Sequence, residues 1–165
     1  MVSLRAKSLE INTNVNQHLF RVLSLKPQEF DNLKNALIGM LPDYYVDPQS
    51  IAGTLARLGK SAAAQKLLTK IPEVKKIRSG DIGEVLTSGY IEEATDFTVP
   101  IRKLRWRDHR NMAMRGDDVI GIFVDQQQQT IKFLKAEAKA NKALSRKVLQ
   151  ESRAELDLDD GFPAP

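Results

Sequence analysis

The stretch Gly116-Asp-Asp-Val-Ile-Gly-Ile-Phe-Val-Asp-Gln-Gln-Gln-Gln-Thr-Ile-Lys-Phe-Leu-Lys-Ala-Glu-Ala-Lys139 decides the fold of the second half of the chain. Residues 119–124 form an apolar, β-branched run that is typical of a buried strand, and the glutamines at 126–129 are typical of a polar turn. Residues 130–139 alternate in places between polar and apolar side chains. We therefore expect a second strand that pairs with the first as a hairpin.

Chemically active side chains stand at the open end of this hairpin. Asp118 directly precedes the first strand, and Glu137 and Lys139 close the second. Side chains two residues apart on a strand point to the same face, so Glu137 and Lys139 project together while Ala136 and Ala138 face the opposite side. We expect these two small residues to let another element pack closely behind the strand.

A helix is predicted immediately before these strands. From Asp81 onward, Ile82 and Val85 recur at helical spacing, and Ser79 suits the N-cap. Glu84 lies on the other side of this helix and can reach the end of the hairpin. We expect Asp81 to stabilise the first turn through the helix dipole, and the alternative is that it faces the site.

The core is predicted to follow the order helix, three strands, helix. Residues 98–106 are interpreted as an edge strand that tolerates Pro100, and residues 143–156 as the last helix. The predicted fold class is therefore α/β (α+β).

The first half of the chain is predicted to form a smaller unit. Its apolar spacing, prolines and glycine predict a strand over 18–25, a helix over 27–41, and helices over 49–58 and 61–71. Proline suits the first turn of a helix and ends a later one, so Pro27 begins the first helix and Pro42 ends it. We expect an α/β or helical cap over residues 1–74 and a catalytic core over residues 75–165.

Three carboxylates and a lysine in this order suit the cleavage of a phosphodiester. A hard divalent ion neutralises charge on the phosphoryl oxygens and makes a bound water acidic enough to attack. Mg²⁺ prefers carboxylate oxygens and keeps several waters, so we expect Glu84, Asp118 and Glu137 to bind Mg²⁺ or Mn²⁺. Lys139 would orient the attacking water or offset charge in the transition state.

Two assignments in this set have competitors within the sequence. With nine Glu and fourteen Lys, the chain holds about one Glu-X-Lys by chance, and Glu73-Val-Lys75 is indeed a second one. Glu137 is favoured because it closes a strand. Asp118 is favoured over Asp117 because it adjoins the buried strand. The alternative for the whole set is a group of solvated charges at the end of a hairpin.

A basic run with one tryptophan leads into Asp118. Between residues 97 and 147 there are twelve Lys and Arg against five Asp and Glu, although the whole chain carries a net charge of only +4. We expect this run to bind the DNA backbone through basic side chains, with an indole ring stacked on a base or sugar. The residues are Arg102, Lys103, Arg105, Trp106, Arg107, Arg110 and Arg115. The alternative is a solvated basic edge strand with Trp106 in the core.

Composition excludes several other classes of protein. A chain of 165 residues with 42% hydrophobic residues is long enough for one full domain. Because there is no cysteine, a disulfide framework, a thiolate zinc site and a cysteine nucleophile are excluded. No apolar run approaches the roughly 20 residues of a membrane span, and the first residues lack a secretory signal. We therefore expect a cytoplasmic protein without membrane contact.

Four sequence blocks resemble the effector nuclease subunit of the Hachiman anti-phage system, within the PD-(D/E)XK superfamily. They are Gly80-Asp-Ile-Gly-Glu84-Val-Leu, Pro100 with Lys103-Leu-Arg105, Met114-Arg-Gly-Asp-Asp118-Val and Ala136-Glu137-Ala-Lys139. The resemblance covers residues 79–156, roughly half of the chain. Since relatives continue with further helices, we expect a core that is shortened at its C-terminal end.

The resemblance implies a restriction-endonuclease-like core, a mixed sheet flanked by helices, and DNA cleavage that depends on a divalent metal. It carries over Glu84, Asp118, Glu137 and Lys139 as the catalytic set. It further implies a partner helicase that keeps the nuclease inactive until aberrant DNA appears. The competing hypotheses are a non-catalytic DNA- or partner-binding module, a stand-alone repair or restriction nuclease, and a helical regulatory subunit.

Overall fold

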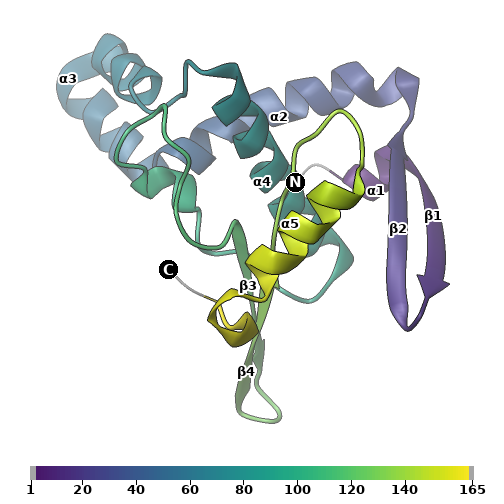
Figure 1. Ribbon diagram of the computed structural model, residues 1–165. Coiled ribbons are helices and arrows are strands. Elements are labelled where there is room, and N and C mark those ends of the chain that lie inside the picture. The colour runs from purple at the N-terminus through teal and green to yellow at the C-terminus, as the bar shows by residue number, and fades with distance from the viewer. Residues whose placement is uncertain (1–2, 164–165) are drawn as a thin grey trace.

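Two antiparallel hairpins project from a group of helices in the computed structural model, which describes residues 3–163 (Figure 1). The elements, in chain order, are α1 (Leu4–Lys7), β1 (Ser8–Val15), β2 (His18–Leu25), η1 (Pro27–Glu29), α2 (Phe30–Tyr45), α3 (Pro48–Leu68), α4 (Lys75–Ala94), η2 (Lys103–Trp106), β3 (Val119–Asp125), β4 (Thr130–Ala136), α5 (Arg146–Leu156) and η3 (Leu158–Gly161). This mixture of helices and strands confirms the α/β class. Within the described residues both sheets are two-stranded and antiparallel, so the predicted mixed sheet is not formed.

The β3–β4 hairpin forms as predicted, with a shorter second strand. Val119 pairs with Ala136 at the open end, and Asp125 pairs with Thr130 beside the turn. Beyond Ala136 the backbone ladder stops, because the N–H of Ala138 donates to Asp118 Oδ2 at 2.9 Å. Glu137 and Lys139 therefore lie just after the strand, where the prediction had placed them within it.

The predicted strand over residues 98–106 is wrong except at Thr98. Thr98 forms an isolated antiparallel bridge with Ile122, through N–H to O distances of 2.9 and 2.8 Å. Pro100 has no N–H to continue such a ladder, and the chain then turns into η2. The third strand is thus reduced to a single bridge at the edge of β3.

The helix that carries Glu84 begins earlier than predicted. α4 starts at Lys75, so Ser79 lies inside the helix and is not its N-cap. Val74, at the N-cap, has no side-chain hydrogen bond of its own. Instead, Asn111 Oδ1 accepts the N–H groups of Glu73 at 2.8 Å and Val74 at 3.3 Å. A distant side chain therefore stabilises this helix start, which local sequence patterns do not reveal.

The N-terminal half contains the predicted strand and helices together with two elements that were not predicted, α1 and β1. β1 pairs with β2 along its whole length, and the turn residues Asn16 and Gln17 have φ of 48° and 67°. α2 continues through Pro42 to Tyr45, so the prediction that Pro42 ends the helix is wrong. The helical region that follows bends at Gly59, where φ is 82°, as the two-helix prediction requires.

One hydrophobic core joins the two halves of the chain. Tyr44, Tyr45 and Val46 at the end of α2 pack with Val85 of α4 and Leu104 of η2, and all five are buried. Aromatic burial at the end of α2 explains why the helix continues past its proline, since packing outweighs the local cost. The domain boundary after residue 74 stays a prediction, and the core is shared across it.

A buried ion pair lies after that boundary, and a hydrogen bond from Tyr45 connects it to the first half of the chain. Asp81 is 2% exposed and Arg107 4% exposed. The Arg107 guanidinium donates to both carboxylate oxygens of Asp81, and Tyr45 Oη donates to Asp81 Oδ2 at 2.7 Å. Asp81 is therefore a partner of Arg107 in the core, and its predicted role in the helix dipole is wrong.

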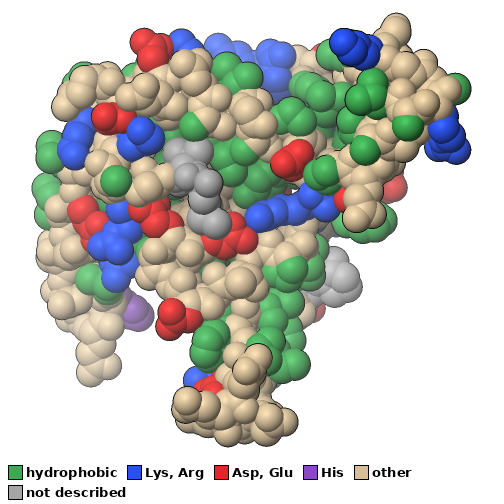
Figure 2. Space-filling view, turned by 180° about the vertical axis from the view of Figure 1, so that it is seen from behind, with side chains coloured by type: hydrophobic (Ala, Val, Ile, Leu, Met, Phe, Trp, Pro, Cys, Tyr) green, Lys and Arg blue, Asp and Glu red, His purple; other side chains and the backbone are tan. Residues whose placement is uncertain are grey.

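The outer part of the β3–β4 hairpin carries apolar side chains that the rest of the molecule does not cover. Val124, Ile131 and Phe133 are each 57–59% exposed, and Figure 2 shows hydrophobic side chains along this projecting hairpin.

Among the described residues, no helix has the length and apolar character to cross a membrane.

We predict that the buried ion pair makes a large contribution to stability. Arg107→Met leaves the Asp81 carboxylate buried without its main partner, so the free energy of unfolding should fall by about 3–5 kcal/mol. Chemical denaturation measures this value. The control is Arg153→Met, which removes an exposed pair with Asp157 and should cost less than about 1 kcal/mol. Equal effects of the two substitutions would contradict the prediction.

Candidate functional site

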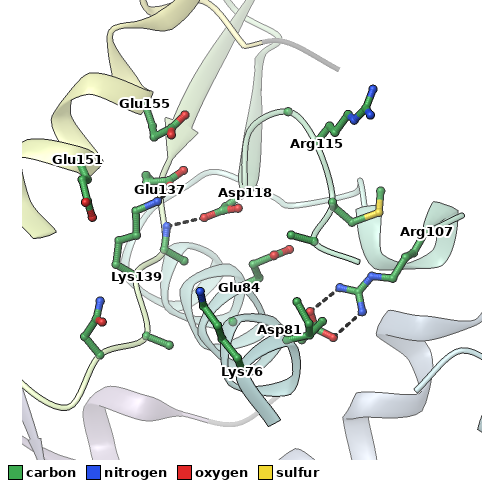
Figure 3. A pocket seen from close by; sticks show the side chains of 18 residues that line it. Lys76, Asp81, Glu84, Arg107, Arg115, Asp118, Glu137, Lys139, Glu151 and Glu155 are labelled. Carbon is green, nitrogen blue, oxygen red and sulfur yellow. Dashed lines mark hydrogen bonds and ion pairs between the residues drawn. The ribbon is translucent and has the colours of Figure 1, made fainter. Parts of the chain in front are cut away.

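A cavity of about 640 Å³ brings the four predicted catalytic residues together (Figure 3). Glu84 comes from α4, Asp118 from the residue before β3, and Glu137 and Lys139 from the segment after β4. Three segments that are far apart in the sequence thus supply three carboxylates and one ammonium group to one space.

Small residues allow α4 to approach the segment that carries Glu137 and Lys139. A Cβ atom placed on Gly83 would lie 3.5 Å from the Cβ of Ala140 and 3.9 Å from that of Ala138. The helix that carries Glu84 therefore packs directly against residues 138–140. This agrees with the prediction for Ala138. Ala136 packs against a buried cluster formed by Ile91, Val99 and Val119.

Asp118 is held by hydrogen bonds at both carboxylate oxygens. Oδ2 accepts the N–H of Ala138 at 2.9 Å, and Oδ1 accepts from Lys103 Nζ at 3.2 Å. The neighbouring Asp117 forms an ion pair of 3.0 Å with Lys135 and does not line the cavity. The geometry therefore favours Asp118 over Asp117 as a ligand.

Glu137 and Lys139 form an ion pair at the side of the cavity next to α5. Burial raises the pKa of Glu137 above its ordinary value, and the negative charge of Asp118 acts in the same direction, against the effect of Lys139. The hydrogen bond to Glu137 raises the pKa of Lys139, so its ammonium group stays charged at neutral pH.

Glu84 has the most strongly altered acidity in the site. Burial raises its pKa to about 8, the charge of Asp118 adds to this rise, and Lys103 opposes it. Lys103 Nζ lies 3.9 Å from Glu84 Oε2. A buried carboxyl group with a raised pKa, in a cavity that holds other carboxylates, is a frequent property of functional sites.

The side chains present fit a divalent cation by their chemistry. Glu84, Asp118 and Glu137 offer hard oxygen donors. The pKa values of Glu84 and Glu137 are raised mainly by burial, and the negative charge of Asp118 adds to both. Within residues 3–163, no three His, Cys, Asp or Glu side chains lie close enough together to hold a metal ion by themselves. Mg²⁺ sites commonly use one or two carboxylates, with water and substrate oxygens completing the shell.

The structure divides the predicted DNA contacts into exposed and occupied groups. Trp106 is 74% exposed, so it does not lie in the core. Arg115 is exposed and lines the cavity, where its side chain points outward in Figure 3. Arg107 is buried and paired with Asp81, and both residues line the cavity, so Arg107 stays a predicted phosphate contact that already has a partner.

The other basic side chains of this run have partners within the protein. Arg102 pairs with Glu92 at 3.2 Å and stacks over the ring of Tyr44. Arg105 Nε donates to Asp43 O at 2.8 Å. Arg110 pairs with Glu73, the member of the second Glu-X-Lys. These side chains are partly exposed, so they remain predicted DNA contacts that would have to exchange partners.

Sequence reasoning missed three acidic or basic residues at the cavity. Glu151 and Glu155 of α5 line it, and Lys76 of α4 lines it from below in Figure 3. The spacing of four residues between Glu151 and Glu155 places both on one helix face, which was the available signal. Their distance in sequence from the hairpin hid the contact.

We predict that Glu84 makes the protein less stable as the pH rises. Its pKa in the folded protein is about 8, against an ordinary value of 4.5, so its favourable contribution is complete below about pH 4.5 and is lost as the pH rises through about 8. Without divalent metal, Glu84→Gln should match the Tm of the parent near pH 5 and exceed it near pH 9 by about 5 °C. Thermal melts across this range test it, and parallel pH profiles would contradict it.

Comparison with known proteins identifies the family. A family model described as HamA matches residues 3–163 of the 165, which is nearly the whole chain. No curated protein matches the chain. The chain therefore belongs to the HamA family, which confirms the resemblance to the Hachiman anti-phage effector subunit and indicates a component of that defence system.

Proposed function

We propose that this protein is a DNA endonuclease of the PD-(D/E)XK type that requires Mg²⁺ or Mn²⁺. The main support is one observation: Glu84, Asp118, Glu137 and Lys139 line a single cavity. We further propose that it is the effector of anti-phage defence under the control of a partner helicase. Membership of the HamA family supports this second part.

The arrangement around the cavity supports a reduced nuclease core. α4, the Thr98 bridge, β3, β4 and α5 follow one another as helix, strand, strand, strand, helix, with the first strand shortened to one pair. The helix contributes one carboxylate and the hairpin end contributes two carboxylates and the lysine. The four residues come from one helix and from the end of a two-stranded hairpin, so this arrangement does not use a larger sheet.

Each side chain has a role that follows from its surroundings. A bound divalent ion would supply Lewis-acid activation of the phosphate and acidify a water molecule. Asp118 and Glu137 offer it oxygen donors, while Glu84 must lose the proton that burial favours at neutral pH before it can do the same. Lys139 keeps its positive charge beside Glu137 and would stabilise developing charge on a phosphoryl oxygen.

The exposed members of the basic run support binding to the DNA backbone. Arg115 lines the cavity and Trp106 stands free on the surface. An arginine and an indole ring suit a phosphate and a base or sugar of any sequence. We therefore propose DNA as the substrate, bound without base-specific readout.

We predict that cleavage depends on the cavity residues and not on the second Glu-X-Lys. In a plasmid-nicking assay with Mg²⁺, Glu137→Gln and Lys139→Ala should each lower the rate by at least about 100-fold, because each removes a transition-state interaction. Glu73→Gln and Lys75→Ala are matched controls outside the cavity, and they should retain the parental rate.

Three results would separate the competing functions. Equal nicking by the parent and all four variants would remove the nuclease proposal and favour a non-catalytic binding module. Robust cleavage by the purified chain, unaffected by any helicase, would favour a stand-alone repair or restriction nuclease. Metal-dependent cleavage that a co-expressed helicase suppresses supports the proposed effector.

We predict that Arg115 contributes to DNA affinity through the backbone. Arg115→Ala should weaken binding to unrelated sequences to a similar extent and make the dependence of log K on log salt shallower by about one unit. Fluorescence anisotropy at several salt concentrations measures both. Arg57→Ala on α3, an exposed arginine remote from the cavity lining, is the control. A loss confined to one DNA sequence would count against this role.

A further inference from the structure

Lys103 is a second lysine beside the proposed catalytic carboxylates, and its surroundings differ from those of a DNA contact. Its Nζ lies 3.2 Å from Asp118 Oδ1 and 3.9 Å from Glu84 Oε2. The side chain is only 13% exposed, and it does not line the cavity. The ammonium group therefore supports the two carboxylates without facing the space that a substrate would enter.

The hydrogen bonds of Lys103 use its full donor capacity. A lysine ammonium group has three N–H donors. They are directed to Asp117 O at 2.8 Å, Asp118 Oδ1 at 3.2 Å and Gly116 O at 3.4 Å. No donor remains for a phosphate oxygen unless one of these bonds breaks.

The three acceptors belong to consecutive residues of the turn that leads into β3. Gly116 in this turn has φ of 77°, a conformation that glycine adopts without strain. One lysine thus holds two carbonyl groups and the Asp118 carboxylate in a fixed relation. Because Asp118 Oδ2 also accepts the N–H of Ala138, both ends of the carboxylate are held.

The backbone beneath Lys103 is itself firmly placed. The next residue, Leu104, is 2% exposed and packs in the core with Val85 of α4. The preceding residue, Arg102, pairs with Glu92 of α4. Lys103 is therefore attached to the same helix that carries Glu84.

We propose that Lys103 is a positioning residue that holds Asp118 and Glu84 at the cavity and does not bind DNA. The consequence of this positioning for catalysis rests on the proposed nuclease function. The effect of Lys103 on Asp118 is independent of that function, and a measurement of local structure can test it alone.

Hydrogen exchange at the Ala138 amide tests the positioning role, because that amide donates to Asp118. In Lys103→Met, Asp118 loses one of its two anchors, and the protection of the Ala138 amide should fall by about tenfold. The Ile122 amide, which donates to Thr98 O at 2.8 Å, is the internal reference for the same sheet and should change by less than about twofold. Lys132→Met, an exposed lysine of β4, is the charge-matched control and should leave Ala138 unchanged.

Two outcomes of this exchange experiment would overturn the proposal. One is an unchanged Ala138 amide in a folded Lys103→Met protein. The other is an equal loss of protection at Ala138 and Ile122, which would indicate general destabilisation. If Lys103→Met does not fold, Lys103→Gln keeps a polar end group without the charge, and the same comparison decides.

DNA binding and turnover separate positioning from phosphate contact. With saturating Mg²⁺, Lys103→Met should lower kcat by at least about tenfold and leave KM for DNA within about twofold. Binding of DNA without divalent metal should also stay within about twofold of the parent. A clear loss of metal-free DNA affinity would overturn the proposal in favour of a phosphate contact. If the parent fails to cleave DNA, the nuclease proposal fails, while the exchange result still decides the role of Lys103.

Discussion

The hydrogen bond from the Ala138 N–H to the Asp118 carboxylate is the interaction on which the site depends. It takes the place of the next backbone hydrogen bond between β3 and β4. The segment before β3 and the segment after β4 therefore stay together where the strands end. The segment that carries Glu137 and Lys139 is thereby kept beside Asp118. Close packing of Gly83 on Ala138 and Ala140 then brings α4 and Glu84 to the same place.

Bringing three carboxylates together has an electrostatic cost that the protein reduces with lysines. Burial raises the pKa of Glu84 and of Glu137, and the charge of Asp118 adds to both effects. Lys139 pairs with Glu137, and Lys103 lies near Asp118 and Glu84. With Glu84 protonated at neutral pH, the two lysines match the charges of Asp118 and Glu137, so a divalent cation that used Glu84 as a ligand would have to displace its proton.

The core beneath the site connects parts of the chain that local patterns had assigned to separate units. Tyr45 at the end of α2 donates to Asp81 of α4, which also accepts from Arg107. This buried group fixes α4 relative to the segment after η2. The N-terminal half therefore supports the helix that carries Glu84, and its role is not limited to a cap.

Local patterns predicted well those elements whose residues are neighbours in sequence. The β3–β4 hairpin follows from an apolar run, a polar turn and an alternating partner, and the bend at Gly59 follows from the conformational freedom of glycine. Predictions were wrong where distant contacts decide. Asn111 stabilises the start of α4, and aromatic burial carries α2 through Pro42. The third strand failed for a local reason, because Pro100 has no N–H to continue the ladder beyond Thr98.

By itself, the sequence determined that the chain has a hairpin with acidic and basic groups at its open end, because strand periodicity and the position of the turn are local properties. It also contained the four residues that the cavity brings together. Only the tertiary structure decided what each charged side chain does. In a sequence pattern one arginine or lysine looks like another, whereas in the folded protein each has different partners. Burial placed Arg107 in the core and three oxygen acceptors surround Lys103, while Arg115 and Trp106 remain open to solvent.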